Sequence, residues 1–132
     1  MDQYEKNILE FNRQLNFGGL EIKNFDLLKK YPKSDSVIIV GVGGSGLPGL
    51  LFKGLSQNLG FKKPIIIWKN YDLPVHGFKR PSYIFISFSG TTEETLSGFK
   101  KLIKRKPKAN VAVLATGGSL KDLAERFKLP LV

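Results

Sequence analysis

The sequence lacks cysteine altogether, which excludes disulfide bonds and thiolate metal sites. It has one histidine and scattered acidic residues, so we expect no metal site and no cofactor. No apolar run approaches the roughly 20 residues that a membrane-spanning helix needs. The first residues are polar and do not form the apolar region of a signal peptide. These absences predict a cytoplasmic protein without a membrane partner.

What is present is enough apolar material for one core. The chain has 132 residues, of which 42% are hydrophobic, which suits a single domain. The formal net charge of +10 raises the possibility of nucleic-acid binding. However, the densest run of basic residues, Lys100 to Lys108, falls at the end of a predicted helix, where the helix dipole favours cations. We therefore expect no nucleic acid, and the excess charge would instead attract anionic metabolites or an acidic protein.

Short apolar runs alternate with segments of helical periodicity along the chain. The runs read as buried strands, and the leucines between positions 47 and 59 trace a helix. An amphipathic helix is expected at the N-terminus, carrying Tyr4, Ile8, Phe11 and Leu15 and ending at residues 16–19. A second helix is expected over Glu21 to Lys30. The five expected strands are residues 37–40, 65–68, 83–86, 111–114 and 129–132.

This alternation predicts right-handed crossovers and a parallel sheet with helices on both faces. The expected fold class is α/β, a three-layer αβα sandwich around a five-stranded parallel sheet, of the flavodoxin-like or Rossmann-like kind. Residues 1–132 form one domain in this interpretation. Residues 36–132 make up the parallel core, and residues 1–35 are a helical segment that packs on it.

Three turns rich in glycine and hydroxyl side chains follow predicted strands, at residues 41–46, 87–92 and 115–119. Ligands of such sheets bind outside the carboxyl ends of the strands. The turn at residues 87–92 carries four hydroxyl groups, on Ser87, Ser89, Thr91 and Thr92, and precedes a predicted helix. Free N–H groups at a helix start favour an anion, so we interpret this turn as a phosphate site. The alternative is a simple cap, with Thr91 and Glu94 as a capping box.

The first turn matches the dinucleotide-binding pattern Gly41-x-Gly43-x-x-Gly46. That pattern expects an acidic residue at the end of the second strand, and the nearest acid here, Asp72, lies in the loop beyond. We therefore interpret Gly43 and Gly44 as allowing the backbone to approach a ligand, with Ser45 adding a hydroxyl. No side chain stands out as a general base, since His76 lies alone in a loop.

Residues 86–96 closely resemble the signature of sugar isomerase (SIS) domains. More narrowly, they resemble the bifunctional phosphoglucose/phosphomannose isomerases. Four other elements resemble that family in the same order: residues 11–14, 41–45, 71–74 and 116–120. Leu50 stands where the family usually has an aspartate, and Thr91 where asparagine is common.

This resemblance implies that Ser45, Ser87, Ser89 and Thr92 bind a sugar phosphate. It places the backbone of Gly43, Gly44, Gly90 and Thr91 beside the substrate. The implied reaction interconverts glucose 6-phosphate, and possibly mannose 6-phosphate, with fructose 6-phosphate. Members of the family have two such domains, and their glutamate base lies beyond the part that this sequence matches, so the catalytic residues are unknown here.

The sequence thus predicts the N-terminal half of an isomerase, incomplete alone, that binds a hexose 6-phosphate. Its expected partner is a complementary second SIS half or a second copy of the chain. One alternative is a stand-alone module that senses a phosphosugar without catalysis. Another is a small nucleotide-binding domain that uses the turn at residues 41–46.

Overall fold

The computed structural model describes residues 2–10 and 22–132 of the chain. Phe11, Leu15, the predicted helix end at residues 16–19 and the family-like residues 11–14 lie outside the described residues. The elements are α1 (Gln3–Leu9), α2 (Phe25–Lys30), β1 (Ser36–Val40), the 3₁₀ turn η2 (Gly43–Gly46), α3 (Leu47–Leu55), β2 (Ile65–Trp68), β3 (Pro81–Ile86), α4 (Glu93–Arg105), β4 (Asn110–Leu114) and α5 (Gly118–Arg126).

The four strands form one parallel sheet in the order β2-β1-β3-β4. The chain moves from β1 outward to β2, and then returns past β1 to β3. The strand order therefore reverses between β1 and β3, which makes their carboxyl ends the switch point where such sheets bind ligands. The predicted α/β class with a parallel sheet is confirmed.

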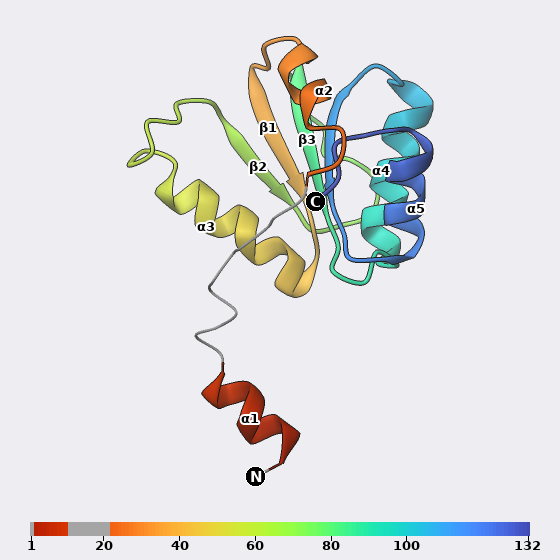
Figure 1. Cartoon of the computed structure of the whole chain (residues 1–132). Coiled ribbons are helices and arrows are strands. Elements are labelled where there is room, and N and C mark those ends of the chain that lie inside the picture. The colour runs from red at the N-terminus through yellow and green to blue at the C-terminus, as the bar shows by residue number, and fades with distance from the viewer. Residues whose placement is uncertain (1, 11–21) are drawn as a thin grey trace.

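Helices cover both faces of the sheet, giving three layers (Figure 1). On one face, Phe99 and Leu102 of α4 and Leu120 of α5 pack against Phe85 of β3, and all four are at most 1% exposed. On the other face, Phe52 of α3 packs in a smaller cluster with the side chains that β1 and β2 direct toward this helix. A loop at residues 69–80 replaces a helix between β2 and β3.

The leucines of α3 do not face the core, although their spacing is that of a buried helix stripe. Leu47, Leu50, Leu51 and Leu55 are between 44% and 58% exposed. The buried side of α3 is instead centred on Gly49, where an added Cβ would lie 2.9 Å from Ile39 Cγ2 and 3.0 Å from Ile67 Cδ1. Because the helix backbone lies so close to β1 and β2 at this glycine, the leucines are turned outward. We call these four residues the leucine face.

The sheet has four strands instead of the predicted five. The segment after α5 approaches β4, but only Leu131 forms a bridge, parallel to Val113 and antiparallel to Lys23. Val113 N–H donates to Pro130 O at 2.9 Å and Val132 N–H donates to Val113 O at 3.0 Å. Continuing this ladder would need a donor at position 130, and proline has no N–H. The fifth strand is therefore reduced to a single bridge.

Tyr31 occupies the place of that missing donor. Its hydroxyl donates to the carbonyl oxygen of Val111 at 2.7 Å, two residues before Val113. Burial raises the pKa of the Tyr31 hydroxyl, although the bond to Val111 acts in the opposite sense. The hydroxyl stays protonated at neutral pH and keeps its proton to donate.

Tyr31→Phe should lower the free energy of unfolding by about 1–3 kcal/mol, because it leaves the carbonyl of a buried residue without this donor. Urea denaturation monitored by circular dichroism measures this change. Tyr4→Phe in α1 is the matched control, since Tyr4 is 73% exposed, and it should change stability by less than about 0.5 kcal/mol. Equal effects of the two substitutions would contradict the role given to Tyr31.

The N-terminal elements differ from the expected pair of helices. α2 begins at Phe25, later than expected, because the residues before it extend toward the C-terminal segment and Lys23 bridges Leu131. No residue of α1 is buried, and the helix points away from the sheet in Figure 1. Within residues 2–10 and 22–132, the helices are all too short or too polar to cross a membrane.

Candidate functional site

Two glycines of the turn after β1, Gly41 and Gly46, leave no room for a side chain. An added Cβ at Gly41 would lie 2.6 Å from Ser45 O, and one at Gly46 would lie 2.9 Å from Gly41 O. Gly43 has a φ of +57°, which favours glycine. Gly44 differs, because its φ is ordinary and an added Cβ would meet nothing within 4 Å. The packing of the chain itself therefore gives no reason for glycine at position 44.

The turn after β3 is organised by the Ser87 hydroxyl. Its Oγ accepts from Gly90 N–H at 3.0 Å and shares a hydrogen bond of 2.9 Å with Thr92 Oγ1. Ser87 is only 1% exposed, so this hydroxyl shapes the turn from inside. Ser89 and Thr91 are exposed, and Thr91 donates both its N–H and its hydroxyl to Ser89 Oγ. Of the four hydroxyl side chains of this turn, two thus reach the surface, Ser87 is internal and Thr92 is half-buried.

The start of α4 has no side-chain cap, so the capping box expected from Thr91 and Glu94 is wrong. The N-cap residue is Thr92, and its side chain bonds to Ser87 instead of to the helix. The first N–H groups of α4 remain available to an external acceptor. Glu93 accepts a hydrogen bond from the Tyr71 hydroxyl at 3.2 Å, which raises the pKa of Tyr71. The Glu93 carboxylate thus turns toward the loop after β2.

The third turn locks the second in place. Thr116 donates its hydroxyl to Phe88 O at 2.5 Å, and Leu120 N–H donates to Gly90 O at 2.9 Å. Gly90 has a φ of +69°, and an added Cβ there would overlap the carbonyl oxygen of Gly117. The two turns are therefore in direct backbone contact. The three predicted turns come together at the carboxyl edge of the sheet, as their positions in the sequence indicated.

Ser45 joins the first turn to the second. Its Oγ accepts a hydrogen bond from Phe88 N–H at 3.3 Å. Beside this contact lies a pocket of about 660 Å³, which spans the ends of β1, β3 and β4 on the side of α3. The polar side chains in its wall are Ser45 and Thr116. The remaining lining residues are Val42, Gly44, Pro48, Ile86, Phe88, Leu114, Ala115 and Val132.

The predicted site residues divide into two groups around Phe88. Gly44 and Ser45 line the pocket, and Gly43 is exposed next to them. Ser89, Thr91 and Thr92 surround the start of α4 and do not line the pocket. Ser87 and Gly90 are buried beneath this second group. The hydrogen bond between Ser45 and Phe88 connects the two groups.

Lys69 is a site residue that the sequence interpretation missed. Its Cε lies 3.2 Å from the position of an added Cβ at Gly46, so its side chain packs over the first turn. One signal could have indicated Lys69, because it follows β2 directly and so lies at the carboxyl edge of the sheet. Its ammonium group adds positive charge to an edge that carries free N–H groups, and both favour an anion.

Two other residues considered from the sequence have structural roles. His76 Nδ1 accepts from Phe78 N–H at 3.2 Å, and its Nε2 lies 3.0 Å from the Tyr83 hydroxyl. The Asp72 carboxylate forms an ion pair of 2.8 Å with Lys101 of α4. The structure contains no group of three or more potential metal ligands within the residues that it describes.

Comparison with known proteins gives relatives that act on phosphosugars by name. No family model matches the chain. The bifunctional phosphoglucose/phosphomannose isomerase of Thermoplasma volcanium is 33% identical over 121 residues, which are 92% of this chain and 35% of the relative. The enzyme of the same name from Caldicellulosiruptor bescii is 35% identical over 104 residues, which are 79% of this chain and 30% of the relative.

A further relative carries a different name. The D-glucosamine-6-phosphate 4-epimerase of Sulfolobus acidocaldarius is 31% identical over 99 residues, which are 75% of this chain and 30% of the relative. The chain spans about a third of the length of the curated relatives it matches. These similarities support a phosphosugar isomerase type of function. The chain is thus related to the phosphoglucose/phosphomannose isomerases over the part of their length that it spans.

Proposed function

We propose that this chain is the phosphosugar-binding part of an aldose–ketose isomerase that interconverts glucose 6-phosphate, and mannose 6-phosphate, with fructose 6-phosphate. The observation that carries the proposal is the uncapped start of α4, with exposed hydroxyls of Ser89 and Thr91 beside it. A phosphate accepts hydrogen bonds from N–H and hydroxyl groups at once, and the helix dipole stabilises its charge. The names of the relatives supply the class of ligand.

In this proposal the sugar extends from the phosphate toward the first turn. Gly44 leaves open space there, and Ser45 presents a hydroxyl on the pocket wall. A side chain at position 44 would occupy the space that the sugar needs. The absence of any internal reason for glycine at this position is explained by close approach of the ligand.

The base of the reaction comes from elsewhere in the proposal. Isomerisation through an enediolate needs a group that moves a proton between adjacent carbons. The ten residues that line the pocket include no acid, no histidine and no lysine. A second part of the enzyme, either a complementary half or another copy of the chain, therefore supplies the carboxylate.

The leucine face is where the second part would pack. It lies on α3, whose first turn borders the pocket through Pro48. Phe88, which is 77% exposed, and the half-buried Ile86 and Leu114 continue the apolar surface across the pocket. Contiguous exposed apolar surfaces mark interaction sites. A partner seated there would close the pocket and bring its base to the sugar.

The competing nucleotide-binding interpretation needs an acidic residue to hold the ribose, and the nearest candidate is already paired. Asp72, which was the nearest candidate to hold a ribose, is paired with Lys101 on α4. A ribose would have to break this ion pair. The sensor interpretation, by contrast, shares the binding site proposed here and differs only in lacking the second part.

An NMR titration of the isotope-labelled chain with fructose 6-phosphate tests the binding site. We expect saturable shifts at Gly44, Ser45 and residues 87–92, at lower concentrations than with inorganic phosphate. The double substitution Ser45→Ala with Ser89→Ala should weaken binding tenfold or more, since a hydrogen bond to the charged phosphate contributes about 1.5–3 kcal/mol and one to the neutral sugar about 0.5–1.5 kcal/mol. The matched control is Ser34→Ala with Ser56→Ala, away from the site, and should bind like the unmodified chain.

Two results of these titrations would contradict the proposal. Fructose 6-phosphate could leave residues 87–92 unshifted in a chain that is folded, or bind the serine double variant unchanged. Either outcome would remove the phosphosugar site from this edge of the sheet. Tight NADPH binding through residues 41–46 would then favour the nucleotide-binding interpretation.

A further inference from the structure

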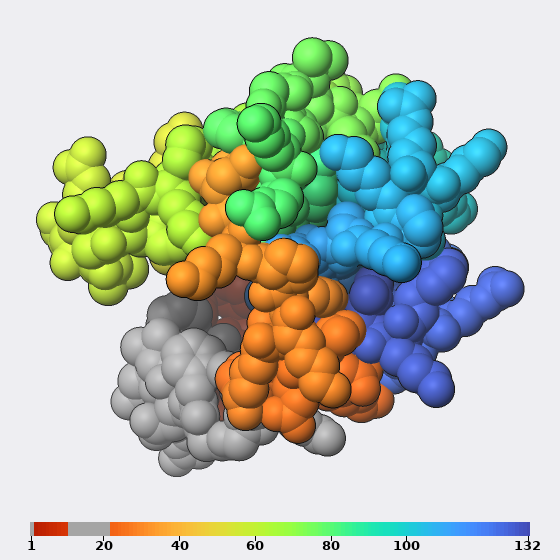
Figure 2. All heavy atoms as spheres, turned by 90° about the horizontal axis from the view of Figure 1, so that it is seen from above, coloured from red at the N-terminus to blue at the C-terminus, as the bar shows by residue number. Residues whose placement is uncertain are grey.

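A second pocket lies at the opposite edge of the sheet, where β3 and β4 begin. It has a volume of about 380 Å³, within the range of small-molecule sites. Three separate segments form it: the loop before β1, the loop before β3 and the connection from α4 to β4. Figure 2 looks onto this edge, and the three segments, coloured orange, green and light blue, meet there. No residue of the proposed phosphosugar site belongs to it.

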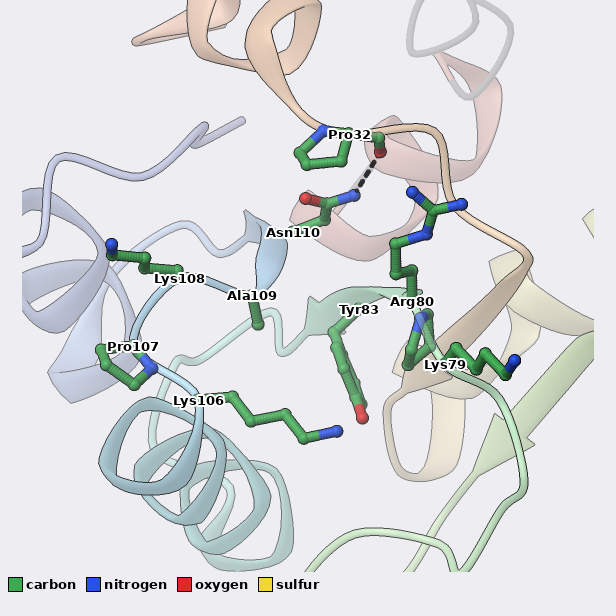
Figure 3. A pocket seen from close by; sticks show the side chains of 10 residues that line it. Pro32, Lys79, Arg80, Tyr83, Lys106, Pro107, Lys108, Ala109 and Asn110 are labelled. Carbon is green, nitrogen blue, oxygen red and sulfur yellow. Dashed lines mark hydrogen bonds between the residues drawn. The ribbon is translucent and has the colours of Figure 1, made fainter.

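The walls of this pocket are held rigidly. Pro32, Pro81 and Pro107 line it, and the ring of each fixes its backbone φ. The Asn110 side chain donates to Pro32 O at 2.8 Å (Figure 3) and to Ser82 Oγ at 3.3 Å, which ties the first segment to both strands. The pocket is therefore preformed, and a ligand would not have to order it.

Basic side chains line two sides of this pocket. Lys106 extends from the end of α4 toward the Tyr83 ring, and Lys79 and Arg80 come from the opposite wall, with the Lys79 ammonium pointing away from Lys106 (Figure 3). Lys108 also lines the pocket, but it points outward. None of the lining residues is acidic. In the described part of the chain, none of the four cations has an ion-pair partner.

The nearest carboxylate is engaged elsewhere. Asp35 accepts the backbone N–H groups of Lys79 at 2.8 Å and of Arg80 at 3.1 Å, so it fixes the loop that carries them. Desolvation opposes its charge, but these N–H bonds prevail and hold the pKa of the Asp35 carboxyl below its ordinary value. The negative charge of Asp35 offsets one of the positive charges of Lys79, Arg80 and Lys106. The four groups together keep a net charge of +2.

The dipole of α4 does not account for this arrangement. It favours cations at the end of the helix, which explains Lys106 and Lys108. Lys79 and Arg80 come from another segment, so the dipole does not explain them, and like charges that line one pocket repel one another. An anion in the pocket removes that repulsion. The proline rings, Ala109 and the Tyr83 ring would contact an apolar part of the same ligand.

We propose that this pocket binds a phosphorylated small molecule in which two or more phosphates are joined to a flat apolar ring, as in a nucleoside diphosphate. The phosphates lie between Lys106 and Arg80, with Lys79 adding positive charge from the same loop, and the ring lies against the prolines and Tyr83. The site is separate from the phosphosugar site, because the six residues of β3 place them about 20 Å apart. The proposal does not depend on the isomerase activity.

Calorimetric titration with ADP tests this assignment. We expect saturable binding with a Kd below about 1 mM, and weaker binding of adenosine, which lacks the charge, and of pyrophosphate, which lacks the ring. NMR shifts should appear at residues 79–83 and 109–110. The triple substitution of Lys79, Arg80 and Lys106 by serine should weaken ADP binding tenfold or more. Substituting Lys53, Lys100 and Lys104 by serine removes the same charge elsewhere and should change the affinity less than twofold.

Several results would overturn the proposal. Equal losses in the two triple variants would mean that ADP responds to net charge alone. Shifts at residues 41–46 in place of 79–83 would move the ligand to the other edge, and no saturation by 5 mM ADP would remove the site. A short single-stranded oligonucleotide that competes with ADP and binds more tightly would make this a nucleic-acid surface. Fructose 6-phosphate shifts at residues 87–92 are read in the same spectra, so either proposal can fail alone.

Discussion

Gly90→Ala is expected to abolish phosphosugar binding and to lower the free energy of unfolding by about 2–4 kcal/mol. Gly90 has a φ of +69°, which costs a residue with a Cβ about 1–2 kcal/mol. The added carbon would also overlap the Gly117 carbonyl, and backbone cannot move aside as a flexible side chain can. Relief requires the second and third turns to separate, which disrupts the bond from Leu120 N–H to Gly90 O and the bond from the Thr116 hydroxyl to Phe88 O.

Gly54→Ala is the matched control for this substitution. Gly54 lies inside α3, and an added Cβ there would meet nothing within 4 Å. This variant should be more stable by about 0.5–1 kcal/mol, because alanine is the better helix former. Urea denaturation and the fructose 6-phosphate titration measure both variants. A Gly90→Ala chain with unchanged stability and unchanged binding would show that the two turns are not locked as described.

The second large effect concerns catalysis. The purified chain should show no detectable conversion of fructose 6-phosphate to glucose 6-phosphate, although it binds the substrate. A positioned acid–base group contributes about 10²–10⁴-fold to such proton transfers, and the pocket wall contains no titratable side chain. An assay that couples glucose 6-phosphate to a dehydrogenase measures this rate, with the full-length Thermoplasma volcanium relative as the positive control.

Turnover by the pure chain at a rate near that of the relative would refute the proposal that the base lies in a second part. The titration separates this outcome from a failure of binding. A chain that binds but does not turn over is consistent with an incomplete enzyme and also with a sensor. Addition of the complementary part distinguishes them, because only an incomplete enzyme gains activity.

Much of the fold could be predicted because buried parallel strands have a strong signal. The apolar runs at residues 65–68 and 111–114 coincide with β2 and nearly with β4. The position of the three turns at one edge also followed from strand direction alone. These features depend on local composition and on the handedness of crossovers, both of which are visible in one sequence.

The errors arose where the outcome depends on tertiary contacts. Periodicity predicted a helix over residues 47–59, of which α3 covers Leu47–Leu55. Periodicity could not tell which side of the helix faces inward, and the contact at Gly49 decided that. Likewise, the sequence near Thr91 offers several possible hydroxyl bonds. The structure uses Thr92 to hold Ser87 and leaves the helix uncapped. Lys69 was missed because its closeness to the first turn depends on β2 lying beside β1.

The two edges of the sheet restrict how this chain can associate. Beyond β4, the bridge between Leu131 and Lys23 occupies the hydrogen-bonding groups that another strand would need. On the other side, β2 has only four residues, and Pro64 and charged Lys63 and Lys69 flank it. Short edge strands guarded by proline and lysine resist strand addition. Assembly by extending the sheet into a neighbour is therefore blocked at both margins, and a partner has to approach through side chains.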